Sequence, residues 1–100
     1  MHIQIINFNY SGISRSEYEA AAAEAAQPIS EIPGLFSKRW LANEETNTYG
    51  GVYFWKTKQH MQDWMDSQIL KDIGANPAFA NSKVIDFEMI ESLSAVTRGV

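Results

Sequence analysis

The amino-acid sequence predicts an α+β domain in which four antiparallel strands form one sheet and two helices cover one face of it. Three observations support this class. Segments with strand and helix patterns follow one another in the order β-α-β-β-α-β along the 100 residues, which is the order of the ferredoxin-like plan. The two central strands are joined by a short polar loop, as in a hairpin. The last strand alternates apolar and acidic residues, which is the period of a strand with one buried face.

The first unit is a strand followed by a helix. Ile3–Asn9 is rich in β-branched and aromatic residues, and Tyr10-Ser11-Gly12 ends it. Ser14 and Glu17 have the spacing of a capping box, in which each side chain pairs with the other residue's backbone N–H. A helix therefore begins there and continues to about Ser30. The face of this helix that we expect to be buried is small, so a neighbour must pack closely against it; it comprises Tyr18, Ala21, Ala22, Ala25 and Ile29.

A hairpin follows Pro33-Gly34, which ends the first unit. Phe36–Ala42 and Tyr49–Lys56 have the composition of strands, and the polar segment Asn43–Thr48 joins them. Gly50-Gly51 stands at the start of the second of these strands, ahead of its large aromatic residues. Because glycine is a poor strand residue, either a β-bulge lies there or a neighbouring group approaches the backbone closely.

The register of this hairpin decides which aromatic side chains share a face, and the sequence leaves it open. If Trp40 lies opposite Tyr53, both flank the same cavity. If Trp40 lies opposite Gly51, the glycine makes room for the indole. If Trp40 lies opposite Val52, Tyr53 goes to the other side of the sheet.

The second helix and the last strand complete the domain. Thr57 is placed to cap the helix, and Gly74 and Asn76-Pro77 end it. The fourth strand is Val84–Ile90, with one face predicted to be buried. That face comprises Ile85, Phe87 and Met89. The buried stripe of the helix, at helical spacing, comprises Met61, Trp64, Met65 and Ile69.

The first and third strands are apolar on both of their faces. In the first strand, for example, Ile3 and Ile5 fall on one face, and Ile6 and Phe8 fall on the other. A strand that is apolar on both faces is usually covered on both, and two helices cover only one side of the sheet. The simplest cover for the other side is the sheet of a second copy, so we expect a homodimer.

Composition restricts the class of protein. The length fits a single domain, residues 1–100, and a net charge of -4 disfavours binding to nucleic acid or to an anionic membrane. The absence of cysteine excludes disulfides, thiolate chemistry, Cys-ligated zinc and iron–sulfur clusters. The N-terminus lacks the pattern of a signal peptide, and no apolar run reaches membrane-spanning length. We therefore expect a cytoplasmic protein.

The sequence contains no motif that would bind a cofactor or a metal. It has neither a GxGxxG nor a GxxxxGK[ST] pattern, and its histidines, His2 and His60, do not form a metal-binding spacing. We expect no metal site and no cofactor. His60 is interpreted as an exposed helix residue, with a proton acceptor or an axial haem ligand as the alternatives.

Aromatic residues and one lysine are the candidate site. Phe8, Trp40 and Trp64 either pack in the core or line a flat pocket for an aromatic ligand, and Gly51 leaves space beside them. Lys38 is unusual in a strand of a buried sheet. It is either an edge lysine with a solvated amine or a cation that stabilises a phenolate or enolate. Tyr53 or Trp64 would then donate a hydrogen bond to a substrate oxygen, with Asn7 as a further donor.

The segment Pro33–Trp55 resembles the YdhR-type monooxygenases, which belong to the dimeric α/β-barrel superfamily of the antibiotic-biosynthesis monooxygenases. The matching residues are Pro33-Gly34, Lys38 and Trp40 two positions apart, Glu44 in the hairpin loop, and Gly50-Gly51 followed by Tyr53. The resemblance implies a ferredoxin-like protomer that pairs through its sheet into a homodimeric α/β barrel, with a pocket between the sheet and the helices of each protomer. Related enzymes oxidise aromatic or polyketide-like substrates with O2 and need no flavin, haem or metal, and others degrade haem.

These observations together lead to a functional hypothesis. We expect a cofactor-independent monooxygenase that uses O2 on a small aromatic or polycyclic substrate. The expected catalytic residues are Lys38 and Tyr53, and the expected substrate-binding residues are Asn7, Phe8, Trp40, Gly51 and Trp64. The alternatives are a homodimer that binds a small hydrophobic ligand without turnover, and a haem-binding or haem-degrading relative in which His60 is the ligand.

Overall fold

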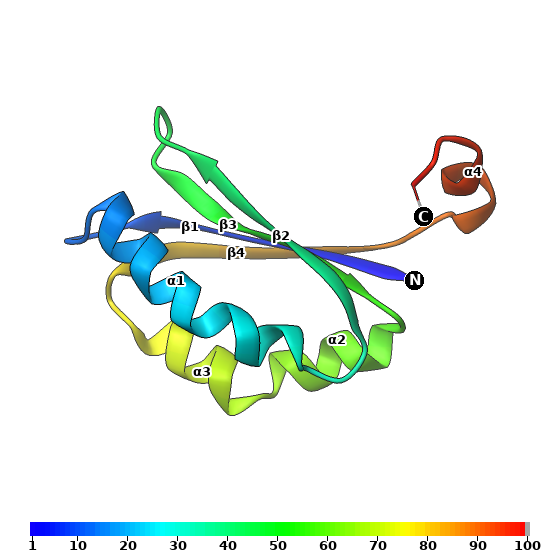
Figure 1. Ribbon diagram of the computed structural model, residues 1–100, viewed down its shortest axis with the longest axis horizontal. Helices are drawn as coiled ribbons and strands as arrows, with labels where there is room; N and C mark the ends of the chain where they lie inside the picture. The colour runs from blue at the N-terminus through cyan, green and yellow to red at the C-terminus, as the bar shows by residue number, and fades with distance from the viewer. Residues whose placement is uncertain (100) are drawn as a thin grey trace.

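The computed structural model, which describes residues 1–99, has one four-stranded sheet with helices against one of its faces (Figure 1). The strands are antiparallel and lie in the order β2-β3-β1-β4. This arrangement confirms the predicted α+β, ferredoxin-like class. The elements in chain order are β1 (His2–Tyr10), α1 (Arg15–Ser30), β2 (Leu35–Asn43), β3 (Thr48–Trp55), α2 (Lys58–Met65), α3 (Gln68–Ala75), β4 (Phe79–Glu88) and α4 (Glu91–Val96).

The first helix begins as the sequence predicts. The Ser14 hydroxyl oxygen accepts a hydrogen bond from the Glu17 backbone N–H at 3.2 Å, and the Ser14 N–H donates to the Glu17 carboxylate at 3.2 Å. This capping box satisfies two of the N–H groups that the first turn leaves free. Ile29 is the buried residue of α1, and the rest of its inner face is mostly alanine. The helix therefore lies over the sheet without filling the space beneath it.

The segment predicted as one second helix is two helices. α2 ends at Met65, and the Ser67 side chain caps α3 by accepting from the Leu70 N–H. The break changes the direction of the chain, so Ile69, which was predicted to be buried, is 40% exposed. Leu70 and Ile73 pack against the core in its place. The sequence pattern did not reveal the break because the apolar spacing continues across it.

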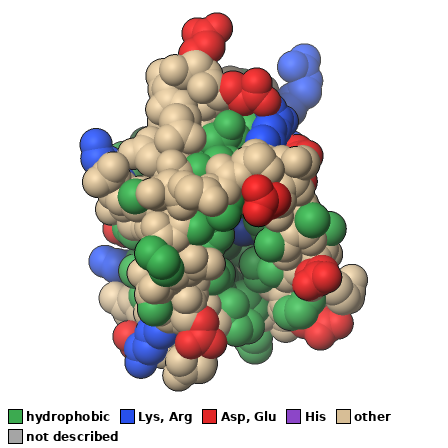
Figure 2. All heavy atoms as spheres, turned by 90° about the vertical axis from the view of Figure 1, so that its left-hand side faces the viewer, with side chains coloured by type: hydrophobic (Ala, Val, Ile, Leu, Met, Phe, Trp, Pro, Cys, Tyr) green, Lys and Arg blue, Asp and Glu red, His purple; other side chains and the backbone are tan. Residues whose placement is uncertain are grey.

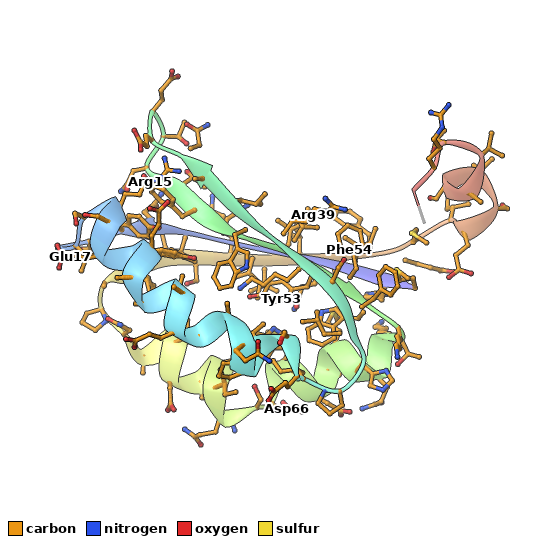
Figure 3. The ribbon with its side chains drawn as sticks, viewed as in Figure 1. Arg15, Glu17, Arg39, Tyr53, Phe54 and Asp66 are labelled. Carbon is orange, nitrogen blue, oxygen red and sulfur yellow. The ribbon has the colours of Figure 1, made fainter. Side chains whose placement is uncertain are left out.

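Side chains alternate between the two faces of the sheet. On β1, Gln4 and Ile6 face the helices and are buried, whereas Ile3 and Ile5 face the other way. Figure 3 shows the same alternation, with Tyr53 on the helix side of the sheet and Phe54 on the opposite side. These alternations set which residues can meet under the helices.

Large aromatic side chains form the core beneath α2. Trp55 of β3 is fully buried, and Trp64 of α2 is 1% exposed. The ring of Tyr53 is parallel to that of Trp55, with centroids 5.9 Å apart, and Met61 completes the cluster. The indole N–H of Trp55 donates to the Gln4 side-chain oxygen at 3.2 Å, which satisfies two buried polar groups at once.

The face of the sheet away from the helices is uncovered in the single chain. Ile85 and Phe87 of β4, which the sequence predicted to be buried, lie on this face and are 50% and 52% exposed. Leu41 of β2 is 37% exposed. We call this surface the open face. Met89, the third residue predicted for this face of the last strand, is buried and 7% exposed, whereas Ile85 and Phe87 stay half exposed within residues 1–99.

The C-terminal helix α4 was not predicted, and it lies beyond the edge of the main body (Figure 1). Its apolar side chains Leu93 and Val96 are 65% and 81% exposed. None of the helices within residues 1–99 is both long and apolar enough to cross a membrane.

Candidate functional site

A cavity of about 360 Å³ lies between the sheet and the helices. Figure 2 shows a hollow, lined mainly by hydrophobic side chains, at the end of the molecule where α1 begins. The cavity size falls within the range of sites for small organic ligands. Its lining comes from α1, the last residue of α2, α3 with its C-cap, and all four strands. It comprises Ile6, Phe8, Tyr18, Ala21, Ala22, Ala25, Ile29, Lys38, Trp40, Gly50, Gly51, Tyr53, Met65, Leu70, Ile73, Gly74, Asn76, Phe79, Ser82 and Val84.

The cavity exists because small residues face one another across it. The inner face of α1 presents Ala21, Ala22 and Ala25, and β3 contributes Gly50 and Gly51 to the lining. The sequence predicted that the small helix face must be packed closely by a neighbour. The structure instead leaves space beneath these alanines.

Gly50 and Gly51 are needed at their positions for different reasons. A Cβ on Gly50 would lie 1.8 Å from the Ile6 carbonyl oxygen, so β1 requires a glycine at this point. A Cβ on Gly51 would lie 2.6 Å from Cε of Lys38. The pairing of β1 with β3 is regular through both glycines, so no bulge lies there. Of the two alternatives left by the sequence, close approach is the one that the structure supports.

The hairpin register brings four predicted residues together. Trp40 lies opposite Gly51, and Lys38 lies opposite Tyr53, so all of them face the helices. The ammonium nitrogen of Lys38 is 3.3 Å from the centre of the Trp40 ring and 4.6 Å from that of the Tyr53 ring. A cation over an aromatic face is attracted by the negative potential of that face. The Lys38 stem crosses the strand over Gly51, which is the space that a side chain at Gly51 would occupy.

Burial controls the ionisation of the groups that line the cavity. It lowers the pKa of Lys38 to about 7, because a charged amine is poorly solvated there. Burial also raises the pKa of Tyr18 to about 12. The pKa of Tyr53 is raised by burial and further by the proximity of Tyr18. Among residues 1–99, no Asp, Glu, His or Arg lines the cavity. Lys38 is therefore the group in this lining that changes charge near neutral pH.

Of the remaining predicted site residues, one lines the cavity and two do not. Phe8 lines the cavity. Asn7 directly precedes Phe8 on β1, and neighbouring strand residues point to opposite faces. Asn7 therefore faces the other side of the sheet and does not line the cavity. Trp64 packs against Tyr53, with ring centroids 5.5 Å apart, but is not part of the lining. Its indole N–H is buried without an acceptor among residues 1–99.

An ion pair connects the hairpin loop to the start of α1. Arg15 of α1 donates to Glu44 of the hairpin loop at 2.5 Å and to Glu19 at 3.2 Å. Figure 3 shows Arg15 near the start of α1, close to the end of the hairpin. Glu44 therefore links the hairpin to α1 and is not part of the cavity lining.

Sequence reasoning missed the contribution of α3 and β4 to the lining. Leu70 and Ile73 of α3 and Phe79 and Ser82 of β4 all face the cavity. The sequence signal for α3 was Ser67, a residue of the type that caps helices, but the continuous apolar stripe concealed it. β4 begins at Phe79, five residues earlier than predicted, which brings Phe79 and Ser82 into the sheet.

His60 lies away from the cavity, in the first turn of α2. Its side chain packs against Gly34, and its ring nitrogen Nδ1 is 2.7 Å from the Thr57 hydroxyl. His60 is not part of the lining, so the sequence-based hypothesis of a haem ligand has no support from its position. Among residues 1–99, no three His, Asp or Glu side chains gather in a group that could hold a metal ion.

Comparison with known proteins gives a family and a fold. A family model described as "Putative mono-oxygenase ydhR" matches residues 3–100. No curated protein matches the chain by sequence.

Several solved structures share the fold. The heme-degrader MhuD from Mycobacterium tuberculosis, which has two hemes bound in its active site, is 19% identical, with 90% of this chain and 96% of that chain covered and a TM-score of 0.72. The cofactor-independent oxygenase SnoaB from Streptomyces nogalater is 18% identical, with 88% and 92% covered and a TM-score of 0.68. A protein of unknown function from Nitrosomonas europaea is 14% identical, with 89% and 88% covered and a TM-score of 0.74. At these identities the likeness concerns the fold.

Proposed function

Because this chain belongs to the family described as "Putative mono-oxygenase ydhR", we propose that it is an oxygenase that uses O2 on a small aromatic substrate without a prosthetic group. The substrate would be a phenol or an enol with one or more fused rings. It would bind in the cavity between the sheet and the helices, with its ring against the aromatic walls and its oxygen at Lys38.

The observation that carries this proposal is a single cationic side chain in a cavity whose lining is mainly apolar and aromatic. The Lys38 amine has no carboxylate partner among residues 1–99 and lies between the rings of Trp40 and Tyr53. A charge left without a partner in such a site is costly, so an anionic ligand would be bound strongly there. A flat phenolate matches both the walls and the charge.

The chemistry follows from the need for an electron donor. A phenol and O2 give a quinone and water, so all the electrons that reduce O2 come from the substrate. A phenolate gives up its first electron far more readily than a phenol, and Lys38 would stabilise that anion. Tyr53, whose hydroxyl stays protonated because its pKa is raised, would donate a hydrogen bond to a substrate oxygen. The low polarity of the cavity strengthens both interactions.

Oxygen uptake tests the proposal. We expect the purified protein to consume O2 with members of a panel of naphthols and anthracenols, and to continue in the presence of chelators. Lys38→Met should abolish most of the uptake, because the anion loses its partner. Lys71→Arg is the matched control, since Lys71 lies exposed on α3 outside the cavity lining, and its uptake should equal that of the wild type. Metal-dependent uptake, or uptake that Lys38→Met leaves intact, would contradict the assignment.

A binding protein without turnover is the second candidate, and it is favoured by the same cavity. Its lining is mostly hydrocarbon, which is enough to bind a small hydrophobic molecule. Naphthols that raise the melting temperature without any O2 uptake would support this reading over the oxygenase.

We also propose that the protein is a homodimer paired through the open face. Ile85 and Phe87 on β4 and Leu41 on β2 leave apolar side chains exposed at both edges of this face, and a monomer seldom keeps an apolar sheet face in water. A second copy presents the same surface and can cover it by two-fold symmetry. Light scattering should give twice the chain mass of 11.3 kDa. Phe87→Asp should give the monomer, and a monomeric wild type at micromolar concentration would overturn this proposal.

A further inference from the structure

Lys38 is held in the cavity by a specific local arrangement. It belongs to the edge strand β2, where a long side chain would ordinarily extend into water. Here its stem lies across Gly51, and its amine ends between two aromatic rings. A glycine inside a strand weakens the strand, so the space it provides for this lysine has a cost in stability. Such an arrangement indicates a use for the amine inside the cavity.

The surroundings of Lys38 favour a neutral amine. The other titratable groups in the lining are Tyr18 of α1 and Tyr53 of β3, and both hydroxyls stay protonated because their pKa values are raised. No acidic side chain among residues 1–99 lines the cavity to hold Lys38 as an ammonium ion. Burial alone lowers its pKa to about 7, so about half of the molecules carry the free amine at neutral pH. Lysines desolvated in apolar pockets are used in this way as nucleophiles.

We propose that Lys38 is a carbonyl-capturing residue that forms a reversible imine with a small aromatic aldehyde or ketone bound in the cavity. The Lys38 nitrogen attacks the carbonyl carbon, and the carbonyl oxygen takes up a proton to give a carbinolamine. Loss of one water molecule from the carbinolamine leaves the C=N bond. No oxidant or reductant is consumed, and water reverses the step. Trp40 and Tyr53 would enclose the aromatic ring of the ligand.

This inference goes beyond the oxygenase proposal and does not depend on it. The charged form of Lys38 would bind a phenolate, and the neutral form would capture a carbonyl, so both uses draw on the same side chain. The first is measured by O2 uptake and the second by covalent attachment. Either can therefore fail while the other stands.

Reductive trapping with 2-naphthaldehyde tests the inference. The protein is incubated at pH 7 with a low concentration of the aldehyde and sodium cyanoborohydride, and the labelled residues are identified by peptide mass spectrometry. We expect one naphthylmethyl group, on Lys38, added at least about tenfold faster than on any other lysine, since an amine of reference pKa is neutral in only roughly one molecule in 2,500 at pH 7. The rate on Lys38 should rise as the pH rises through about 7 and then level off.

Two comparisons make the result specific. Lys38→Arg, which retains a positive charge but cannot form an imine, should remove the fast labelling, whereas Lys71→Arg should not change it. In the wild type, excess naphthalene, which has no carbonyl group, should slow labelling of Lys38 by occupying the cavity. This second measurement needs no variant to fold. Labelling spread evenly over the exposed lysines, or labelling of Lys38 that naphthalene leaves unchanged, would overturn the inference.

Discussion

Beneath α2 the space between sheet and helices is filled by large side chains, whereas beneath α1 and α3 it is hollow. The packed half holds Trp55 and Trp64, both almost completely buried. The hollow half has alanines on its helix and glycines on its strand, and it encloses the cavity of about 360 Å³. One strand, β3, serves both halves, with Gly50-Gly51 in the hollow half and Trp55 in the packed half.

The difference shows how one small domain can be both stable and open. Burial of two indoles supplies several kcal/mol of stabilisation, roughly 1.5–3 for each large apolar side chain, and Tyr53 and Met61 pack around them. The hollow half gives up the packing that leucines would have supplied in place of alanines. It keeps Lys38 in a position that costs free energy, and such sites are commonly functional.

The largest expected effect comes from emptying the packed half. Trp64→Ala should lower the free energy of unfolding by about 3–5 kcal/mol, because it removes a buried indole and leaves a cavity that its neighbours cannot fill. Urea denaturation monitored by circular dichroism measures the change. A loss below about 1 kcal/mol would mean that the two halves are not packed differently.

The two glycines should respond differently to the same substitution. Gly50→Ala should cost about 2–3 kcal/mol, because its Cβ meets the backbone oxygen of Ile6 at 1.8 Å, and backbone cannot move aside. Gly51→Ala meets the flexible end of Lys38 at 2.6 Å, and it meets Cε1 of Tyr53 and the Arg39 carbonyl oxygen at 3.3 and 3.4 Å. Because the tightest of these contacts is with a flexible side chain, its cost should stay within about 1 kcal/mol.

Of the two variants, Gly51→Ala has the smaller expected loss of stability, but it should have a clear effect on ligand binding. Gly51→Ala should displace Lys38 and weaken naphthol binding by about tenfold or more, a loss of about 1.4 kcal/mol. Titration calorimetry measures this affinity. Equal stability losses in the two variants would contradict the separate reasons given for the two glycines.

Removing the charge from the hollow half should stabilise the protein. The pKa of Lys38 is lowered from 10.5 in the unfolded chain to about 7, so between these values the unfolded state binds more protons and stability rises with pH. Below about pH 7 the full penalty of the buried charge applies. Lys38→Met should therefore be more stable than the wild type by about 1–2 kcal/mol at pH 6, a moderate value because the cavity opens to water.

The advantage of Lys38→Met should shrink as the pH approaches 10. Melting curves at pH 6, 8 and 10 measure it, and the Lys71→Arg variant controls for general effects of charge. A Lys38→Met variant less stable than the wild type at pH 6 would contradict the burial of this amine.

The smallest effect on stability should come from filling the hollow half. Ala25→Leu places a larger side chain in existing space, so the free energy of unfolding should change by less than about 1 kcal/mol. Naphthol binding should nevertheless fall at least tenfold. Ala20→Leu is the matched control, because Ala20 lies exposed on the same helix outside the cavity lining. Equal binding by both variants would mean that the ligand does not occupy this cavity.

The fold could be predicted from the sequence because its signals are local. The capping box of Ser14 and Glu17 and the cap at Thr57 depend on residues three apart, and both are confirmed. The split into α2 and α3 could not be predicted, because the apolar spacing continues across the point where Ser67 caps a new helix. The exposure of Ile85 and Phe87 likewise could not be predicted from the alternation of β4, because this pattern marks an apolar face without showing what covers it.

The site could be predicted only in part, because its geometry depends on strand register. The sequence identified Lys38, Trp40 and Tyr53 as candidates but left three registers open, and one of them would have put Tyr53 on the far side. The observed pairing of Trp40 with Gly51 brings all three together. Asn7 shows the opposite case, since the alternation of β1 puts it on the face away from the cavity. The direction of the Lys38 side chain over Gly51 has no signature in the sequence.

Both uses proposed for Lys38 require that the cavity beneath α1 binds a ligand. A crystal of the protein soaked with 6-bromo-2-naphthol tests this directly, because the anomalous signal of bromine locates the ligand. We expect the signal between Ala25 and Gly51, with the naphthol oxygen within hydrogen-bonding distance of the Lys38 amine. A cavity that stays empty while the bromine lies elsewhere, or a cavity closed by the side chains of α1 and α3, would contradict the account.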